Sequence, residues 1–87
     1  MKCSELENGR QVVFKIYSDI YKRKIPECGT VSFVNKNRKE VYVSWLEGYK
    51  DRGDSIPYED MLAAYDENGE MMKFNNISGK SVLLIAE

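Results

Sequence analysis

Eleven side chains in this sequence are suited to ligand binding, each through a positive charge or a tyrosine ring. Lysine and arginine bind phosphate groups, and tyrosine rings stack on nucleic-acid bases. Most of them fall in segments rich in Gly, Asn, Asp and charged residues, which are typical of loops. The candidate binding residues are Tyr21, Lys22, Arg23, Lys24, Lys36, Arg38, Lys39, Tyr49, Lys50, Arg52 and Tyr58.

A second explanation for the same residues is an ordinary solvated surface. Acidic Asp19, Asp51 and Asp54 lie among the cations, and tyrosines often bury the ring and leave the hydroxyl group in water. The net charge of the 87 residues is −1, with eleven Lys/Arg and seven Asp/Glu in residues 1–52, and two and seven in residues 53–87. Such a dipolar chain could present a basic face to phosphate, or its charges could interleave on folding.

The sequence offers little for catalysis or metal binding. It has no histidine, so it lacks the usual general base near neutral pH. Two cysteines, Cys3 and Cys28, do not suffice for an ordinary structural zinc site. We therefore expect a protein that is not an enzyme and uses neither metal nor cofactor, although an endoribonuclease toxin working with Arg and hydroxyl groups is a further alternative.

The composition also predicts the compartment. The N-terminus lacks the apolar run of a signal peptide, and no segment approaches the ~18 apolar residues of a membrane helix. We expect a cytoplasmic protein with unpaired cysteines, Cys28 being a core residue, and no contact with membranes. A small, His-free chain rich in Lys and Asn suits a bacterial or phage accessory protein.

Alternating apolar residues predict three strands, at Gln11–Ser18, Thr30–Asn35 and Glu40–Leu46. Charged loops are expected at Asp19–Glu27 and Glu47–Ser55. The residues expected to face the core are Val12, Phe14, Ile16, Val31, Phe33, Val41, Val43 and Trp45.

The remaining segments predict further short strands. Ile56–Leu62 opens extended and tightens into a helical turn, and the Asp66-Glu67-Asn68-Gly69 turn joins Leu62–Tyr65 to Glu70–Phe74. Ser81–Ala86 is an apolar closing strand. Residues 1–10 form a loose lead-in with at most one helical turn, and residues 11–87 form a single domain. Five to six short antiparallel strands at this spacing favour a small all-β barrel.

The stretch from Gly29 to Leu62, with the pattern G-x-V-x-F-V…V-x-V-x-W-L-E-G-Y…I-P-x-E-D-M-L, resembles Tudor and KOW-type domains of the SH3-like barrel superfamily. The Tudor resemblance implies an aromatic cage for methylated side chains, with Tyr17, Tyr21, Tyr49 and Tyr58 above Trp45. Glu27-Cys28 stand where Tudor domains usually carry an aromatic pair, which argues against a methyl-lysine cage. The KOW resemblance implies contacts of the loops with RNA, DNA or a protein.

We therefore expect a non-enzymatic binding module that acts through protein–protein interaction. The near-neutral charge and the apolar terminal strand favour a protein partner or self-association. The alternative is an RNA- or DNA-binding barrel that uses the loop Lys, Arg and Tyr residues, and the third candidate is the ribonuclease toxin. That toxin would depend on Arg38 or Arg52.

Overall fold

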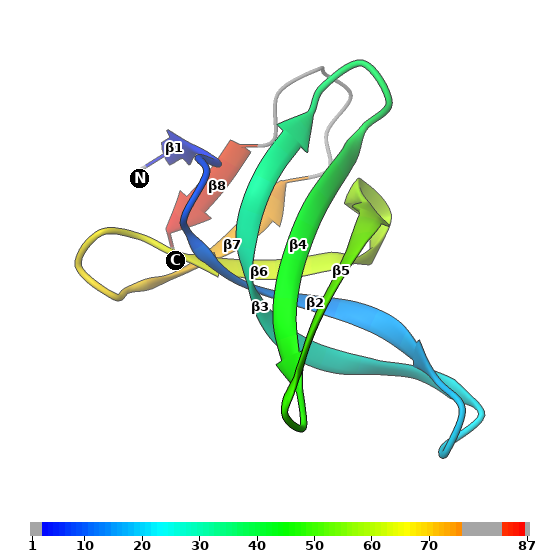
Figure 1. Cartoon of the computed structure of the whole chain (residues 1–87). Coiled ribbons are helices and arrows are strands. Elements are labelled where there is room, and N and C mark those ends of the chain that lie inside the picture. Colours follow the sequence, from blue (N-terminus) through cyan, green and yellow to red (C-terminus); the bar gives the residue numbers. More distant parts are fainter. Residues whose placement is uncertain (1–2, 76–82, 87) are drawn as a thin grey trace.

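A computed structural model of the chain describes residues 3–75 and 83–86, which form one antiparallel sheet in the strand order β1-β8-β7-β6-β2-β3-β4-β5 (Figure 1). The expected all-β class is confirmed, but the sheet has eight strands rather than five or six. Its described strands end at β1 on one side and β5 on the other without closing into a barrel. The elements are β1 (Cys3–Glu5), β2 (Gln11–Ser18), β3 (Arg23–Asn35), β4 (Glu40–Glu47), β5 (Lys50–Pro57), the 3₁₀ turn η1 (Tyr58–Asp60), β6 (Met61–Tyr65), β7 (Met71–Asn75) and β8 (Leu83–Ala86).

The core lies on the inner face of β2 to β6, and the predicted alternation holds in β2 and β4. Val12, Phe14, Val41 and Val43 are fully buried, and the Phe14 and Trp45 rings lie 5.3 Å apart between centroids at 60°. Tilted aromatic pairs of this kind add to the stabilisation from burial alone. In the described part of the chain, no helix is long and apolar enough to cross a membrane.

Strand β3 is longer than predicted, because it begins at Arg23 inside the expected loop Asp19–Glu27. It pairs with β2 from Ser18↔Arg23 to Gln11↔Thr30. Only residues 19–22 form the turn, and Lys22 adopts a positive φ of 57° there. The charged run and Pro26 indicated a loop, yet both are compatible with a strand edge that faces solvent.

A bulge in β3 makes the prediction for Phe33 wrong. The register shifts between Val31↔Val43 and Phe33↔Tyr42, so Ser32 is the extra residue. Phe33 consequently lies on the outer face and is 52% exposed, while Val34 packs against the core.

The expected loop Glu47–Ser55 is also a strand in large part. β5 pairs with β4 from Glu47↔Lys50 to Glu40↔Pro57, and Gly48 and Tyr49 form the turn, with Gly48 at a φ of +64°. All residues of β5 before Ile56 are exposed, so a hydrophobic pattern could not reveal this strand. The predicted change from an extended segment to a helical turn is confirmed by η1.

The N-terminal segment is part of the sheet and not a loose lead-in. β1 pairs with β8 from Cys3↔Ile85 to Glu5↔Leu83, and the following Leu6 is buried. The hairpin turn at residues 66–69 is confirmed, since β6 and β7 pair on either side of it. The closing strand is confirmed at Leu83–Ala86, and Ser81 and Val82 lie outside the described residues.

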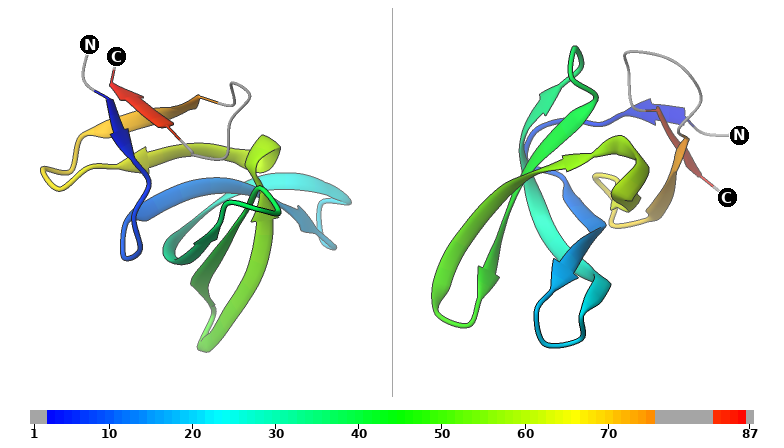
Figure 2. Two further views of the ribbon diagram at one scale, coloured as in Figure 1. Left: turned by 90° about the horizontal axis from the view of Figure 1, so that it is seen from above. Right: turned by 90° about the vertical axis from the view of Figure 1, so that its right-hand side faces the viewer.

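Strand β3 changes its partner half-way along its length, and the sheet divides there. Residues 23–30 pair with β2 on one side, whereas residues 30–35 pair with β4 on the other. Beyond the pair Thr30↔Ser44, which we call the fork, the two hairpins therefore diverge. Figure 2 shows them as separate projections, the β2–β3 arm (residues 15–27) and the β4–β5 arm (residues 45–52).

Candidate functional site

Gly29 lies at the base of the fork, where β3 and β4 come closest. A Cβ added to Gly29 would lie 2.6 Å from the backbone oxygen of Ser44 and 3.0 Å from Cε1 of Phe14. Only glycine fits this approach, because the first contact is with backbone and the second with a core ring. The small residue thus keeps the two strands together up to the point where the arms separate.

A cleft of about 360 Å³ lies between the arms. Its apolar lining comes from both hairpins, with Ile16 and Ile25 on one side and Trp45 on the other. Its charged lining consists of the carboxylates of Asp19, Glu27 and Glu47 and the guanidinium of Arg52, and the remaining lining residues are Tyr17, Ser18, Ile20 and Tyr21.

Arg52 is held in the wall of this cleft by two partners. Its guanidinium carbon lies 5.4 Å from the centroid of the Trp45 ring, a cation–π distance, and its Nη1 donates a hydrogen bond to Oε2 of Glu47. That hydrogen bond is the main cause that raises the pKa of Arg52, and the charges of Asp54 and Asp19 add to it. Asp19 belongs to the opposite arm, so the two arms interact electrostatically across the cleft.

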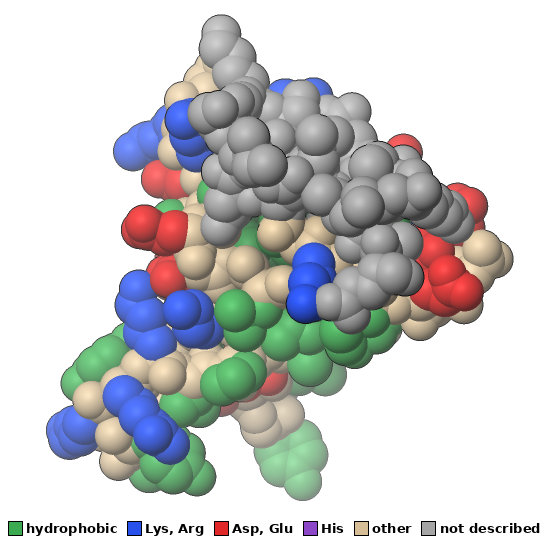
Figure 3. Space-filling view, turned by 180° about the vertical axis from the view of Figure 1, so that it is seen from behind, with side chains coloured by type: hydrophobic (Ala, Val, Ile, Leu, Met, Phe, Trp, Pro, Cys, Tyr) green, Lys and Arg blue, Asp and Glu red, His purple; other side chains and the backbone are tan. Residues whose placement is uncertain are grey.

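The tips of both arms expose large apolar side chains. Ile20 is 87% and Leu46 68% exposed, Tyr17 and Tyr21 are more than half exposed, and Tyr49 is fully exposed. Figure 3 shows hydrophobic and cationic side chains interleaved over the β2–β3 arm. Exposed apolar groups that gather around one cleft indicate an interaction surface, whereas isolated ones are common on any protein.

The unpaired strand edges beside the cleft are blocked against further strand pairing. The N–H of Val31 donates to the Arg10 carbonyl on the β2 side, so the N–H of Cys28 points to the opposite, unpaired side. It donates there to Oε1 of its neighbour Glu27 (3.0 Å), and Pro26 on the same side has no N–H.

The edge strand β5 is blocked in the same way. The N–H of Ser55 donates to Oδ1 of the preceding Asp54 at 2.8 Å. A preceding carboxylate therefore occupies an outward N–H on both edges, which protects proteins from edge-to-edge association. Cys28 itself is an exposed free thiol, so the expectation that it is a core residue is wrong.

Lys24 ties the β2–β3 arm to η1 and does not belong to a free basic patch. Its Nζ lies 2.7 Å from Oδ2 of Asp60, which is the buried polar residue of the described core. The hydrogen bond to Asp60 raises the pKa of Lys24, and the charges of Asp60 and Glu59 act in the same direction. A buried carboxylate needs such a partner, so this pair has a structural role.

The predicted binding residues separate into three places. Tyr21, Lys22 and Arg23 lie on the β2–β3 arm, and Tyr49, Lys50 and Arg52 lie on the β4–β5 arm; of these six, Tyr21 and Arg52 line the cleft. Lys36, Arg38 and Lys39 form the β3–β4 turn at the other end of the β4 strand (Figure 1). Tyr58 belongs to η1 and packs against the core.

Two details of the sequence hypotheses change with this placement. Tyr17 and Tyr21 share the cleft with Trp45, but Tyr58 is not part of it, so the four tyrosines do not form one cage. Arg38 and Arg52 lie near opposite ends of β4, since Glu40 and Trp45 alone are roughly 17 Å apart at about 3.3 Å per residue. They cannot serve one catalytic site together.

Sequence reasoning missed the apolar residues Ile20 and Leu46 as site residues, and it considered Tyr17 only for the aromatic cage. Leu46 and Tyr17 carried a usable signal, since both fall on the outward side of their strand alternation. Ile20 had a weaker one, as an isolated aliphatic residue within a turn.

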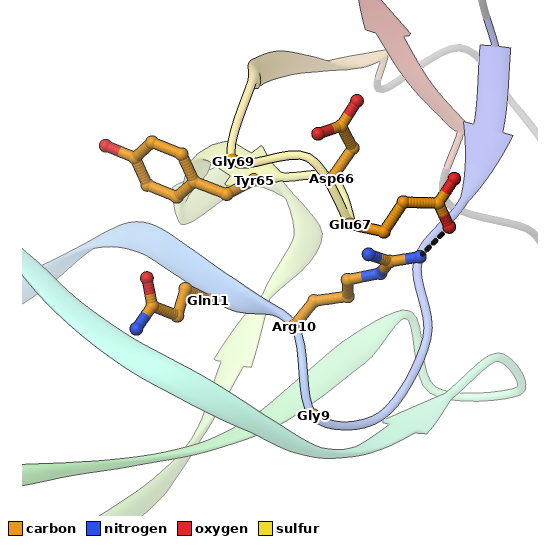
Figure 4. A pocket seen from close by; sticks show the side chains of 7 residues that line it. All are labelled: Gly9, Arg10, Gln11, Tyr65, Asp66, Glu67 and Gly69. Carbon is orange, nitrogen blue, oxygen red and sulfur yellow. Dashed lines mark ion pairs between the residues drawn. The ribbon is translucent and has the colours of Figure 1, made fainter.

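A second hollow of about 430 Å³ lies beside the β6–β7 turn and is lined mainly by polar groups (Figure 4). Arg10 reaches across it to Glu67, and the ion-pair distance is 3.5 Å. A second carboxylate, that of Glu7, lies at the same distance from the Arg10 guanidinium. Both contacts stabilise the approach to β2 and neutralise the arginine, so this hollow is a structural feature rather than an anion site.

Comparison of the chain with family models, curated proteins and solved structures finds no match. The resemblance to Tudor and KOW domains therefore stays a prediction. Within residues 3–75 and 83–86, no group of three or more His, Cys, Asp or Glu side chains is placed to hold a metal ion.

Proposed function

We propose that the chain is a non-enzymatic binding module that holds a partner protein in the cleft between the β2–β3 and β4–β5 arms. The observation that carries this proposal is that exposed Ile20 and Tyr21 of the β2–β3 arm line the cleft between the two arms, while exposed Leu46 and Tyr49 lie on the tip of the other arm. Tyrosine and arginine are enriched at the energetically dominant positions of protein interfaces.

The charge of the cleft favours protein over nucleic acid at this place. Asp19, Glu27 and Glu47 oppose the single guanidinium of Arg52, and Glu47 already pairs with it. Phosphates would meet three carboxylates here, whereas a segment with an apolar side chain beside a lysine or arginine would find both an apolar floor and opposite charge. The blocked strand edges further favour recognition through side chains over addition of a strand.

We propose an SH3-like fold for the chain together with this binding role. The order β6-β2-β3-β4-β5, with one 3₁₀ turn between β5 and β6, is the order expected of a small SH3-like barrel, with β1, β7 and β8 as additions. Because that superfamily hosts many unrelated activities, the fold supports a binding role only weakly and the cleft supports it more strongly.

A photo-crosslinking experiment tests the proposed interface. A photoreactive amino acid replaces Tyr21 or Tyr49 on the arms, or Met71 as an exposed control on β7. We expect one discrete protein to be captured in the cells that encode the chain from both arm positions and not from position 71. The purified partner should then bind the Ile20→Ser/Tyr49→Ser variant at least tenfold more weakly than the wild type, since dominant interface residues contribute about 2 kcal/mol or more.

The control is the stability of that variant, which should stay within about 0.5 kcal/mol of the wild type because both side chains are exposed. Light scattering decides whether the partner is a second copy of the chain. Equal binding of wild type and variant, or equal capture from all three positions, contradicts the proposal.

A further inference from the structure

The outer face of the sheet carries an aromatic pair that the cleft does not use. Phe33 and Tyr42 are direct partners across β3 and β4, and both point away from the core, Phe33 because of the bulge at Ser32 and Tyr42 because it alternates with buried Val41 and Val43. They are 52% and 42% exposed. Directly opposed residues on one face have Cβ atoms about 4.5–5.5 Å apart, so the two aromatic side chains leave the sheet at neighbouring points.

The residues beside this pair on strand β5 have small side chains or none. Ser55 is the β5 partner of Tyr42, and Gly53 is the β5 partner of the neighbouring Ser44. A Cβ added to Gly53 would lie 2.8 Å from the Tyr42 hydroxyl oxygen, so the tyrosine extends over the glycine. The Tyr42 ring therefore lies over Gly53 with one side toward β5, and both aromatic residues keep about half of their surface exposed.

Three cations follow the pair in the turn between its two strands. Lys36, Arg38 and Lys39 are exposed and lie in the turn that begins three residues after Phe33 and ends three residues before Tyr42, within about 10 Å along either strand. The neighbouring carboxylate is that of Glu40, 3.9 Å from Nε of Arg38, and the contact is exposed. An exposed pair at this distance contributes little, so Arg38 can exchange it for a phosphate.

We propose that this outer face of the β3–β4 hairpin binds single-stranded nucleic acid. Phe33 and Tyr42 would stack on two successive bases, and the turn cations would contact the adjoining phosphates. Adjacent exposed rings beside clustered cations are the combination that single-strand binding requires, because stacking tolerates any base and the charge attracts the backbone. This surface is separate from the acidic cleft, so each of the two proposed binding functions can be tested and refuted without affecting the other.

Fluorescence anisotropy with labelled 12-nucleotide oligo(U) and oligo(dT) at 50 mM salt tests this inference. We expect Phe33→Ala to weaken binding about tenfold, since one stacked base is worth about 1–3 kcal/mol. Two phosphate contacts, from Arg38 and Lys39, predict a slope of log K against log salt of about −1.4, and Arg38→Gln should reduce it to about −0.7. Tyr21→Ala and Tyr49→Ala on the arms are the matched controls and should leave binding unchanged.

Several outcomes would overturn the inference. These are the absence of binding to both oligonucleotides, loss of binding on the arm substitutions, or a Phe33→Ala variant that is folded by circular dichroism and binds as the wild type does. Equally tight binding of polyglutamate would show a general polyanion site and contradict base stacking. A preference for oligo(U) over oligo(dT), or the reverse, leaves the proposal intact and identifies which strand the face prefers.

Discussion

Adding a single methyl group at Gly29 should destabilise the sheet at the point where the two arms separate. In Gly29→Ala the new Cβ would lie 2.6 Å from the Ser44 backbone oxygen and 3.0 Å from Cε1 of Phe14, whereas real Cβ contacts essentially never fall below 3.0 Å. Overpacking of this kind typically costs about 1–3 kcal/mol. Because the backbone must move, we expect a cost in the upper part of that range. Alanine also makes the unfolded chain less flexible, which favours folding by about 0.4–1 kcal/mol and offsets part of that cost. The net loss should be about 2 kcal/mol.

Urea unfolding measures this loss as a fall of the midpoint of roughly 2 M, given a slope near 1 kcal/mol per molar urea for a small protein. Gly53→Ala is the matched control, because its new Cβ would meet only the hydroxyl end of Tyr42, which can rotate away. That variant should lose less than about 1 kcal/mol. A Gly29→Ala protein within 0.5 kcal/mol of the wild type, or a larger loss in Gly53→Ala, would refute the account of the fork.

Three further predictions concern the core, the arm and the edges. Phe14→Ala removes the ring that contacts Trp45 and should cost about 3–5 kcal/mol in urea unfolding, and a loss below 1 kcal/mol would exclude a central role for this ring. The raised pKa of Lys24 implies a contribution to stability that is present below its ordinary pKa near 10.4 and is lost as the pH rises through the higher folded value. The stability difference between wild type and Lys24→Met should thus be constant from pH 7 to 9 and shrink as the pH rises above the ordinary lysine pKa, and a constant difference would contradict the pairing. Glu27→Val with Asp54→Val frees the outward N–H groups of both edges and should produce concentration-dependent oligomers in light scattering, while a strictly monomeric variant would show that the carboxylates do not protect the edges.

The strands that carry the core could be predicted because their sequences alternate. β2 matches its expected range from Gln11 to Ser18, and Val41, Val43 and Trp45 of β4 are buried as expected. Phe33 shows the limit of this reasoning. Its position in the pattern indicated the core, but a single bulge at Ser32 places it on the opposite face. A bulge depends on how two strands fit together, and alternation within one strand does not record it.

The candidate site was predictable in part. The cations and tyrosines of the two arms were identified by type, and two of them, Tyr21 and Arg52, line the cleft between the arms. Their grouping was not predictable, since it depends on where β3 exchanges β2 for β4 as its partner. Lys24 shows the consequence most clearly. Its neighbours in the sequence indicated a basic patch, whereas its actual partner is Asp60, 36 residues away.

The two segments mistaken for loops share a physical reason for their composition. Residues 23–27 and 50–55 belong to strands with one unpaired edge, and they consist largely of charged residues, glycine and proline. An exposed edge must avoid pairing with other chains, and charge, proline and local capping of N–H groups achieve this. The same residues are favoured in loops because they too leave the backbone to water. A protected edge strand therefore has the sequence of a loop, and an exposed apolar residue beside it, such as Leu46 in β4 or Ile20 in the β2–β3 turn, is the feature that indicates an interface.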